Sequence, residues 1–365
     1  MRIVIDLTSL SYHISGIERY AACMTEEMLK LDLYNEYLLV FRNEVYVTFK
    51  PFVDNKRINA IVLHGNNKVI FLQLILPFAL YRTKADKYIF FAFTNPILFK
   101  KKGIINTIHD MGAWDLANSM TYFQRLYWRF TYRISATVSE RIITVSKFSR
   151  DRINTILRYP NEKIYIIYPA VYDGITKNYN HSFKDIKEKY HLPDKYIMTL
   201  STLEPRKNME LLLKSYTAIQ EKVDYDLVLV GRKGWKINDI FEKYNCKERI
   251  HITGFIEDED IALIYKNAIC FVFPSLYEGF GLPPIEALTL GTPVIASNAA
   301  SLPEILMDRA TYFKNNDVNS LKDILENLKI NVKAMPNSLN MFQKENYDFK
   351  VSANTVLKII TENQE

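Results

Sequence analysis

The chain has 365 residues, of which 48% are hydrophobic, 24% charged and 13% aromatic, with a formal net charge of +6. This length suggests about two domains, and the composition excludes a collagen, a disordered protein and a small disulfide-stabilised scaffold. Residues 1–170 hold 23 Lys and Arg against 14 Asp and Glu, whereas residues 171–365 hold 24 against 27, so the first half has either an anionic partner or simply a basic surface.

Short apolar runs alternate with segments of helical period along the chain, and this alternation predicts βαβ units with parallel sheets. In the first half, the amphipathic stretches at 17–31, 121–136 and 147–157 are expected to form helices. The strands expected there are 2–7, 37–41, 58–63, 88–93, 104–108, 141–145 and 164–168.

The second half repeats this rhythm, so we expect an α/β protein with two Rossmann-like, doubly wound domains. The first would span 1–172 and the second 183–340, separated by a polar run at 173–182 that lacks periodicity. Two such sheets facing each other would enclose a cleft at the carboxyl ends of their strands. The strands expected in the second half are 196–200, 226–231, 250–253, 269–273, 293–296 and 311–313, and the helices are 207–222, 258–268, 284–290 and 317–330.

The most informative segment runs from Phe271 to Leu288 and places Glu278, two glycines and Glu286 between a buried strand and a helix. Glycines allow backbone N–H groups to approach a ligand, and a helix N-terminus attracts an anion. Two carboxylates would repel a phosphate, so their useful role is to accept hydrogen bonds from sugar hydroxyls. The alternative is an ordinary strand–helix turn in which Glu286 favours the helix dipole.

A second segment, Leu200-Ser-Thr-Leu-Glu-Pro-Arg206-Lys207-Asn-Met-Glu, also follows a strand and precedes a helix. Arg206 offers a planar fork of donors and Lys207 a point charge, a combination that suits a diphosphate. For such a pair alone a solvated basic turn is the alternative, but the Glu-x7-Glu segment favours a functional role.

With these two segments the chain resembles the family four retaining glycosyltransferases, which have the GT-B architecture of two Rossmann-like domains. The resemblance implies that Glu286 holds the nucleotide ribose and that Glu278 contacts the transferred hexose. Lys207 and Arg206 would stabilise the leaving diphosphate without a metal ion. Backbone groups facing the donor would come from Gly279, Phe280, Gly281 and Leu282.

Other candidate donor contacts follow neighbouring strands. Ser201 stands where the family commonly has another Arg, so Arg206 would have to supply both charges. The strand ends at Gly231 and Phe255 would line the nucleobase pocket, although ordinary turn residues explain them equally well. The resemblance also implies that residues 341–365 form a C-terminal helix that returns towards the first domain.

The first half has candidates of its own. Gly16 separates the first strand from the first helix and would let that helix N-terminus approach the diphosphate. His109 ends another strand, and the resemblance implies that it bonds the donor sugar near the reacting carbon; the alternative is a histidine satisfied in the core or in a turn. Asp110 would orient this loop. The catalytic residues expected are His109, Asp110, Glu278 and Lys207.

Two basic segments are candidates for the acceptor or membrane side. Ser146 and Lys147 open a predicted helix, where they could face the acceptor or cap the helix. Arg125, Arg129 and Arg133 recur every four residues among aromatic side chains, a pattern suited to lipid headgroups. The alternative is a helix that packs its rings into the core and leaves a solvated basic face.

Other classes of protein lack support. The acidic run Asp258-Glu-Asp260 precedes a helical stretch and suits its N-terminus better than a metal clamp. The resemblance implies that no metal and no cofactor is bound. The sequence contains no P-loop, G-x-S-x-G, H-E-x-x-H or nucleic-acid-binding module. The chain opens on a strand, its three cysteines are far apart, and no apolar stretch reaches the roughly 18 residues of a bilayer span. We therefore expect a cytoplasmic protein at the inner face of the membrane.

From the resemblance we expect a retaining, metal-independent hexosyltransferase that uses a nucleotide sugar, with GDP-mannose as the favoured donor. Its acceptor would be a saccharide or lipid-linked saccharide in lipopolysaccharide or O-antigen biosynthesis, reached by peripheral contact with an anionic membrane. Two alternatives stay open. One is a non-catalytic, nucleotide-binding partner subunit, and the other is a phosphorylase or epimerase of the same architecture.

Overall fold

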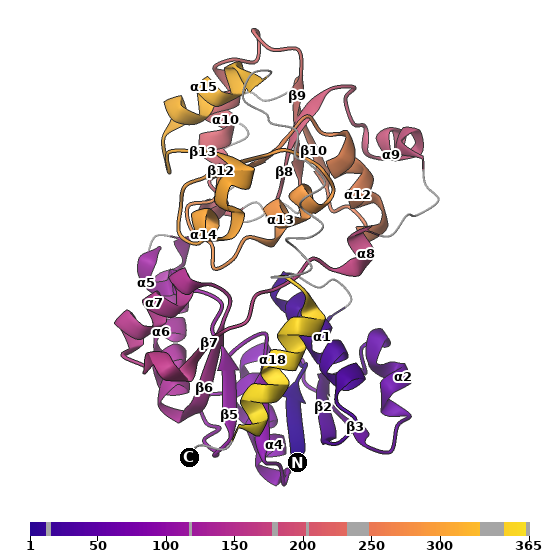
Figure 1. Cartoon of the computed structure of the whole chain (residues 1–365), viewed down its shortest axis with the longest axis vertical. Coiled ribbons are helices and arrows are strands. Elements are labelled where there is room, and N and C mark those ends of the chain that lie inside the picture. The colour runs from indigo at the N-terminus through magenta and orange to yellow at the C-terminus, as the bar shows by residue number, and fades with distance from the viewer. Residues whose placement is uncertain are drawn as a thin grey trace. The chain divides into compact units, whose positions relative to one another are not determined.

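The chain divides into two compact units, each built on one parallel sheet with helices packed on its faces (Figure 1). Unit 1 comprises Met1–Ala170 and Asn346–Glu365, and unit 2 comprises Val171–Glu345. The division follows Ala170, close to the boundary at 172 that the sequence suggests. The computed structural model describes residues 1–11, 16–116, 119–176, 182–201, 204–231, 248–328 and 347–362.

The sheet of unit 1 has seven strands in the order β3-β2-β1-β4-β5-β6-β7. β1 pairs with β2 on one side and with β4 on the other, so the winding of the chain reverses between β1 and β4. Open α/β sheets bind ligands beyond the carboxyl ends of the strands at such a point. The strands are β1 (Arg2–Asp6), β2 (Glu36–Arg42), β3 (Ile58–Leu63), β4 (Lys87–Phe90), β5 (Ile104–Thr107), β6 (Ser139–Thr144) and β7 (Ile164–Ile166).

Several helices of unit 1 begin at side chains that accept hydrogen bonds from free backbone N–H groups, among them α6 and α7. Thr121 and Gln124 form a capping box at the start of α6, and Ser146 accepts a hydrogen bond from the backbone of Ser149 at the start of α7. Residues 68–82 are helical throughout, with a π-helical turn between α3 and α4. The helices are α1 (Gly16–Leu31), α2 (Lys50–Val53), α3 (Lys68–Ile70), α4 (Leu76–Arg82), α5 (Gly112–Asp115), α6 (Tyr122–Val138) and α7 (Lys147–Leu157).

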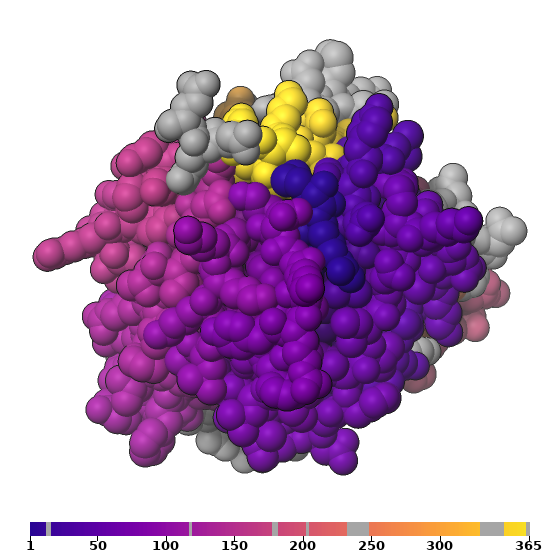
Figure 2. Space-filling model, turned by 90° about the horizontal axis from the view of Figure 1, so that it is seen from below, coloured from indigo at the N-terminus to yellow at the C-terminus, as the bar shows by residue number. Residues whose placement is uncertain are grey.

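The C-terminal helix α18 (Phe349–Thr361) belongs to unit 1, where it packs against α1. On the surface seen in Figure 2 this helix, in yellow, lies beside the indigo N-terminal segment. The buried Arg141 of β6 donates hydrogen bonds to the backbone oxygens of Ile359 and Glu362 and so ties the end of α18 to the sheet. Of the segment 341–365 predicted as helical, residues 341–346 and 363–365 lie outside the described residues.

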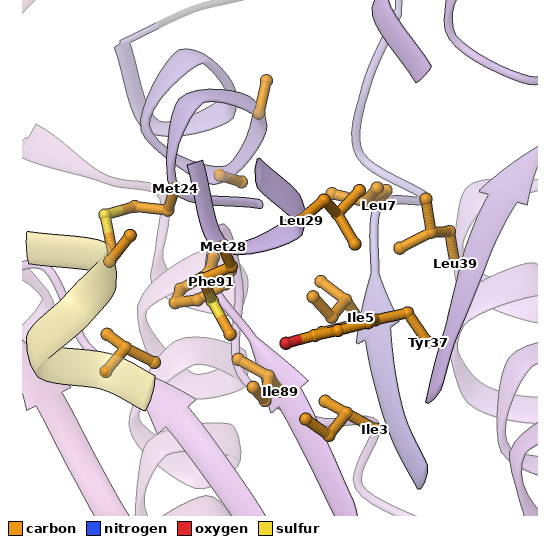
Figure 3. Packing of buried hydrophobic residues seen from close by; sticks show 14 of the residues in the cluster. Ile3, Ile5, Leu7, Met24, Met28, Leu29, Tyr37, Leu39, Ile89 and Phe91 are labelled. Atoms are coloured by element: carbon orange, nitrogen blue, oxygen red, sulfur yellow. The ribbon is translucent and has the colours of Figure 1, made fainter. Parts of the chain in front are cut away.

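The main core of unit 1 lies between its sheet and the helix pair α1 and α18. Figure 3 shows Met28 of α1 directed towards Ile89 of β4, whereas Met24 of the same helix is directed towards the yellow C-terminal helix. Val356 of α18 is fully buried in the same cluster. The last helix of the chain therefore completes the core that the first strand begins.

The sheet of unit 2 has six strands in the order β10-β9-β8-β11-β12-β13. β8 pairs with both β9 and β11, so here the winding reverses between β8 and β11. All strands predicted for both halves are present, and their ends differ by three residues at most. The strands of unit 2 are β8 (Tyr196–Leu200), β9 (Asp226–Val230), β10 (Ile250–Gly254), β11 (Phe271–Phe273), β12 (Val294–Ser297) and β13 (Ala310–Phe313).

Two helices of unit 2 are shorter than predicted. The segment 207–222 forms α10 only over Met209–Thr217. The helix begins at Met209 because Asn208 adopts a left-handed conformation with φ 53° and separates α10 from the 3-10 turn Pro205–Lys207. Within the predicted segment 317–330, α15 spans Val318–Glu326, and residues 329 and 330 lie outside the described residues. The other helices are α8 (Asp173–Thr176), α9 (Phe183–Tyr190), α12 (Asp258–Asn267), α13 (Leu282–Thr289) and α14 (Leu302–Leu306).

Candidate active site

The loops that follow β8 and β11 are joined at the point where the sheet of unit 2 reverses its winding. The backbone N–H of Leu276 donates to the carbonyl oxygen of Arg206 over 2.9 Å, and the hydroxyl of Ser275 reaches the same oxygen at 3.3 Å. These bonds hold the basic turn Pro205–Lys207 against the loop that carries Glu278, although the two segments are far apart in the sequence. The topology therefore brings together the two segments that carried the strongest sequence signals.

An ion pair forms the centre of this junction. Nζ of Lys207 lies 2.6 Å from Oε1 of Glu278, and the hydroxyl of Ser275 donates to the same oxygen over 2.6 Å. The other carboxylate oxygen, Oε2, lies 3.4 Å from Nη1 of Arg206. The side chains of Lys207 and Glu278 are only 12% and 8% exposed. Both oxygens of a buried carboxylate are thus paired with a cation.

Burial and ion pairing have opposing effects on the pKa values of Glu278 and Lys207. Burial alone would raise the pKa of Glu278, but attraction to Lys207 and Arg206 together with the hydrogen bonds lowers it overall. Glu278 is therefore ionised at neutral pH. Burial lowers the pKa of Lys207, and the charge of Glu278 only partly opposes this change. The site holds an ionised carboxylate whose charge is balanced locally.

Arg206 divides its guanidinium between two carboxylates. Its Nε and Nη2 atoms each lie 3.2 Å from Oε1 of Glu204, while Nη1 faces Glu278 and the carbonyl oxygen of Tyr277. The basic turn therefore presents its two cations already paired with two carboxylates. An incoming diphosphate would compete with Glu204 and Glu278 for Arg206, which makes its binding an exchange of anionic partners.

The loop between Glu278 and α13 is held in a conformation that only glycine adopts easily. Gly281 has φ 97°, and a Cβ atom there would lie 2.7 Å from a side-chain carbon of Leu302. Gly279 and Phe280 are buried beside it. The hydroxyl of Ser301 donates to the carbonyl oxygens of Glu278 at 2.9 Å and Phe280 at 3.3 Å. The loop is thus fixed from a neighbouring element.

Helix α13 begins at Leu282, one position before Pro283 and Pro284. Proline has no backbone N–H, so these two residues remove donors from the first turn. The backbone donors near this helix terminus must then come from Leu282 and from the glycine loop before it. Fewer backbone N–H groups are therefore available to an anion at this helix N-terminus than the sequence suggested.

Glu286 is half-buried on α13 and is approached by a buried tyrosine. The hydroxyl of Tyr265, from α12, lies 3.4 Å from Oε2 of Glu286 and also 3.4 Å from the carbonyl oxygen of Pro283. Burial, and then the charge of Glu286, raises the pKa of Tyr265 well above its usual value. Tyr265 therefore stays a neutral donor that orients the carboxylate.

The remaining candidates of unit 2 lie at the carboxyl ends of β8, β9 and β10. Ser201 is buried beside Gly231, which has φ 138°, and a Cβ atom on Gly231 would lie 2.0 Å from the carbonyl oxygen of Ser201. Phe255 follows the edge strand β10 and is 42% exposed. The other predicted members of the turn after Gly231 lie at 232–235, outside the described residues.

In unit 1, His109 joins the ends of two strands and the first helix. Its Nε2 atom lies 2.9 Å from the carbonyl oxygen of Phe91, next to the end of β4, and Tyr20 of α1 packs edge-on against the ring at 5.3 Å. A carbonyl only accepts, so Nε2 carries the proton of the neutral ring. Burial lowers the pKa of His109, which favours this neutral form.

Asp110 and Gly16, the other two candidate donor-side residues of unit 1, each stand at or near the start of a helix. Oδ1 of Asp110 accepts a hydrogen bond from the backbone of Gly112 at 2.8 Å, which orients the turn into α5. Gly16 is the first residue of α1, and residues 12–15 before it lie outside the described residues. The structure thus gives Asp110 the loop-orienting position that the sequence suggested.

The basic candidates of α6 and α7 are placed as follows. Ser146 caps α7 and is fully buried, and Lys147 is the exposed first residue of that helix. The guanidinium groups of Arg129 and Arg133 lie 5.6 and 5.7 Å from the ring of Trp114 in α5, and that of Arg125 lies 5.6 Å from the ring of Tyr122. Arg129 also donates to a backbone oxygen of α5, that of Ala113. Two of the three arginines therefore attach α5 to α6.

The sequence interpretation missed four residues of the site: Ser275, Tyr265, Ser301 and Glu204. Ser275 stands three residues before Glu278, a spacing at which a hydroxyl can bond back across a turn, so a signal existed. Tyr265 and Ser301 lie on other elements, and no local pattern connects them to Glu286 or Glu278. Their positions follow from the packing of α12 and α14.

Residues 182–347 match the family model described as glycosyl transferases group 1. This segment of the chain resembles the group 1 glycosyltransferases. It contains the paired Lys207 and Glu278 and all six strands of the unit 2 sheet. The family resemblance drawn from the sequence is confirmed over this segment.

The chain is similar over its length to O-antigen chain mannosyltransferase B of Escherichia coli, with 27% identity over 90% of this chain and 91% of that protein. It is 32% identical to the serotype-specific mannosyltransferase WbdA of Escherichia coli, but there the match covers 53% of this chain and only 24% of that protein. The crystal structure of Anabaena HepE in complex with UDP and glucose superposes with a TM-score of 0.74 and 14% identity over 99% of both chains. The predicted GT-B fold is thereby confirmed.

Proposed function

We propose that this protein is a glycosyltransferase that transfers mannose from GDP-mannose to a saccharide acceptor, with retention of the anomeric configuration and without a metal ion. The observation that carries the proposal is the buried pair of Lys207 and Glu278, joined by Arg206, at the switch point of the unit 2 sheet. Glu286, from the helix that follows the same loop, adds a carboxylate suited to a ribose diol.

The charges of this site suit a negatively charged leaving group. Lys207 and Arg206 stabilise the diphosphate as the bond from the sugar C1 to the phosphate oxygen breaks. The acceptor oxygen forms its bond to C1 on the same face, and its proton passes to the departing phosphate oxygen. Glu278 accepts hydrogen bonds from the sugar hydroxyls and holds the sugar in place.

A relative that matches over nearly the whole chain supports mannose as the transferred sugar and polysaccharide assembly as the process. That relative is named an O-antigen chain mannosyltransferase, so we infer an acceptor of the same kind, a lipid-linked saccharide in surface polysaccharide assembly at the inner face of the cytoplasmic membrane. The structure of HepE in complex with UDP and glucose supports a nucleotide sugar as the donor.

The test is a turnover assay with a panel of nucleotide sugars that includes GDP-mannose, UDP-glucose and UDP-galactose, each with EDTA and with a lipid-linked saccharide acceptor. We expect GDP release with GDP-mannose alone, and an NMR coupling constant that places the new linkage in the anomeric configuration of the donor. Release from a UDP-sugar would overturn the choice of donor. Inversion, or a sugar trapped covalently on a side chain, would overturn the mechanism.

One further outcome separates this proposal from a non-catalytic subunit. Such a subunit would bind a nucleotide without releasing sugar, whatever the acceptor. Calorimetric titration with GDP, carried out beside the turnover assay, distinguishes the enzyme from the non-catalytic subunit. For the enzyme, Lys207→Ala should reduce turnover severely and Glu286→Ala should weaken nucleotide binding. Tight binding of GDP with no turnover in the presence of acceptor would favour the subunit.

A further inference from the structure

Two helical segments of unit 1 expose apolar side chains in stripes. Ile70, Leu74 and Phe78 recur every four residues along 68–82 and are 51%, 58% and 59% exposed. Phe123, Leu126 and Phe130 recur along α6 and are 81%, 55% and 54% exposed. Among the described residues, ten of the eighteen exposed large apolar side chains belong to 69–98 and 122–130. We call the six residues of the two stripes, Ile70, Leu74, Phe78, Phe123, Leu126 and Phe130, the apolar surface.

The segment 68–82 is apolar on its inner face as well. Phe71, Leu76 and Leu80 are fully buried in the core beneath it. A surface helix of a globular protein ordinarily turns a polar face to water, and a helix that is apolar all round is found buried. The outer stripe of this segment is therefore not explained by packing within unit 1.

A hydrogen bond joins the two segments between their stripes. The side-chain amide of Gln73 donates to the hydroxyl of Tyr127 over 3.0 Å, and its oxygen accepts from the backbone N–H of Ile97 at 3.0 Å. On α6, Phe123 and Phe130 lie one turn on either side of Tyr127. The two stripes thus flank one fixed contact, and the segments present them as neighbours.

The segments that carry the apolar surface and the neighbouring stretch 96–103 are positively charged. Residues 66–85, 96–103 and 119–138 contain nine Lys and Arg and no Asp or Glu. One cation lies directly on a ring of this surface, since the guanidinium of Arg82 is 4.1 Å from the ring centre of Phe78. A second, that of Arg125, lies over Tyr122, which precedes Phe123 in α6. The occupant of this surface must therefore offer an apolar interior and an anionic boundary.

We propose that the apolar surface docks on the anionic face of a phospholipid bilayer, with its aliphatic and aromatic side chains below the headgroups and the surrounding cations at the phosphates. A second copy of the chain fits less well, because a symmetric contact through this surface would bring cations against cations. The inference refines the membrane contact of the proposed function: the contact is made by the apolar stripes, and Arg129 and Arg133 remain with Trp114.

The test is sedimentation of the full chain with vesicles. Wild type should bind vesicles of phosphatidylglycerol and phosphatidylcholine at least about tenfold more tightly than vesicles of phosphatidylcholine alone. The double variant Phe123→Ser/Phe130→Ser should lose about tenfold or more of this binding. The matched control is Leu33→Ser/Tyr34→Ser, at two apolar residues of unit 1 that are 64% and 92% exposed, and it should bind as wild type. Circular dichroism and thermal unfolding check that both variants are folded.

Three results would overturn the docking proposal: no binding of wild type to anionic vesicles, an equal loss in the Leu33/Tyr34 control, or a wild-type dimer in sedimentation equilibrium that Phe123→Ser/Phe130→Ser dissociates. Vesicle binding is measured without donor or acceptor, so it stands or falls independently of the proposed transfer reaction. Conversely, turnover with a water-soluble saccharide acceptor should be unchanged in Phe123→Ser/Phe130→Ser if only docking is lost.

Discussion

The Nζ atom of Lys207 lies 2.6 Å from Oε1 of Glu278, and each residue comes from a loop that follows a different strand of the pair flanking the switch point of the unit 2 sheet. Both side chains are nearly buried, so each is the principal counterion of the other. Removing one charge leaves the other buried and poorly compensated, whereas removing both does not.

The first prediction concerns the stability of this ion pair. Lys207→Met should lower the free energy of unfolding by about 3 kcal/mol, because Glu278 would keep only the longer contact with Arg206 and the hydroxyl of Ser275. Adding Glu278→Gln should restore part of the loss, since a neutral amide needs no counterion. Both variants should lack transferase activity. Urea unfolding followed by fluorescence measures the difference.

An exposed ion pair supplies the control for that experiment. Nζ of Lys222 lies 2.9 Å from Oε1 of Glu326, with side chains 63% and 33% exposed. Lys222→Met should destabilise the protein far less than Lys207→Met, because water screens this pair. Equal losses in Lys207→Met and Lys222→Met would show that burial gives the site pair no special weight.

The second prediction concerns pH. Burial lowers the pKa of His109 below its usual value of 6.5, so the unfolded chain takes up a proton before the folded chain does. The contribution of His109 to stability should therefore be constant above about pH 7 and fall between pH 6.5 and the folded-state pKa, by at most about 1.4 kcal/mol per pH unit. His109→Gln should remove this dependence, and His64→Gln, at an exposed histidine, should keep it. Identical profiles for the two variants between pH 7 and 5 contradict the prediction.

The third prediction tests Glu286 as the ribose ligand. Glu286→Gln should raise the dissociation constant for GDP about tenfold, because hydrogen bonds from the ribose hydroxyls to a carboxylate are stronger than those to an amide. Glu259→Gln, at an exposed acid in the first turn of α12, is the matched control and should bind GDP as wild type. Isothermal titration calorimetry makes the measurement, and an unchanged constant for Glu286→Gln would remove this residue from the donor site.

The fourth prediction uses two glycines at the ends of neighbouring strands. Gly254→Ala should cost about 1 kcal/mol, because φ is 74° but no atom lies within 4 Å of the added Cβ. Gly231→Ala should cost about 3 kcal/mol or more, because the new Cβ would lie 2.0 Å from the carbonyl oxygen of Ser201 and the backbone must move. Urea unfolding measures the loss in free energy of unfolding for both variants. Equal losses would mean that the backbone of Ser201, after β8, shifts at little cost.

Much of the architecture could be predicted from local patterns. A strand covered on both faces must be apolar along its length, as β1 is with Ile3, Val4 and Ile5. A helix between such strands must repeat its apolar residues every three or four positions. These constraints act within a few residues, so the strands are predicted to within three residues of their ends. The two segments with Glu278 and Lys207 were recognised for the same reason, since each is continuous in the chain.

By itself, then, the sequence determined the order of strands and helices, the resemblance to a known family, and the identity of the charged residues after β8 and β11. Only the tertiary structure decided that Lys207 and Arg206 are paired with carboxylates, that Tyr265 and Ser301 support the site, and that Arg129 packs on Trp114. Each of these contacts joins residues distant in sequence, so its existence depends on strand order and helix packing. Local periodicity carries no information about them.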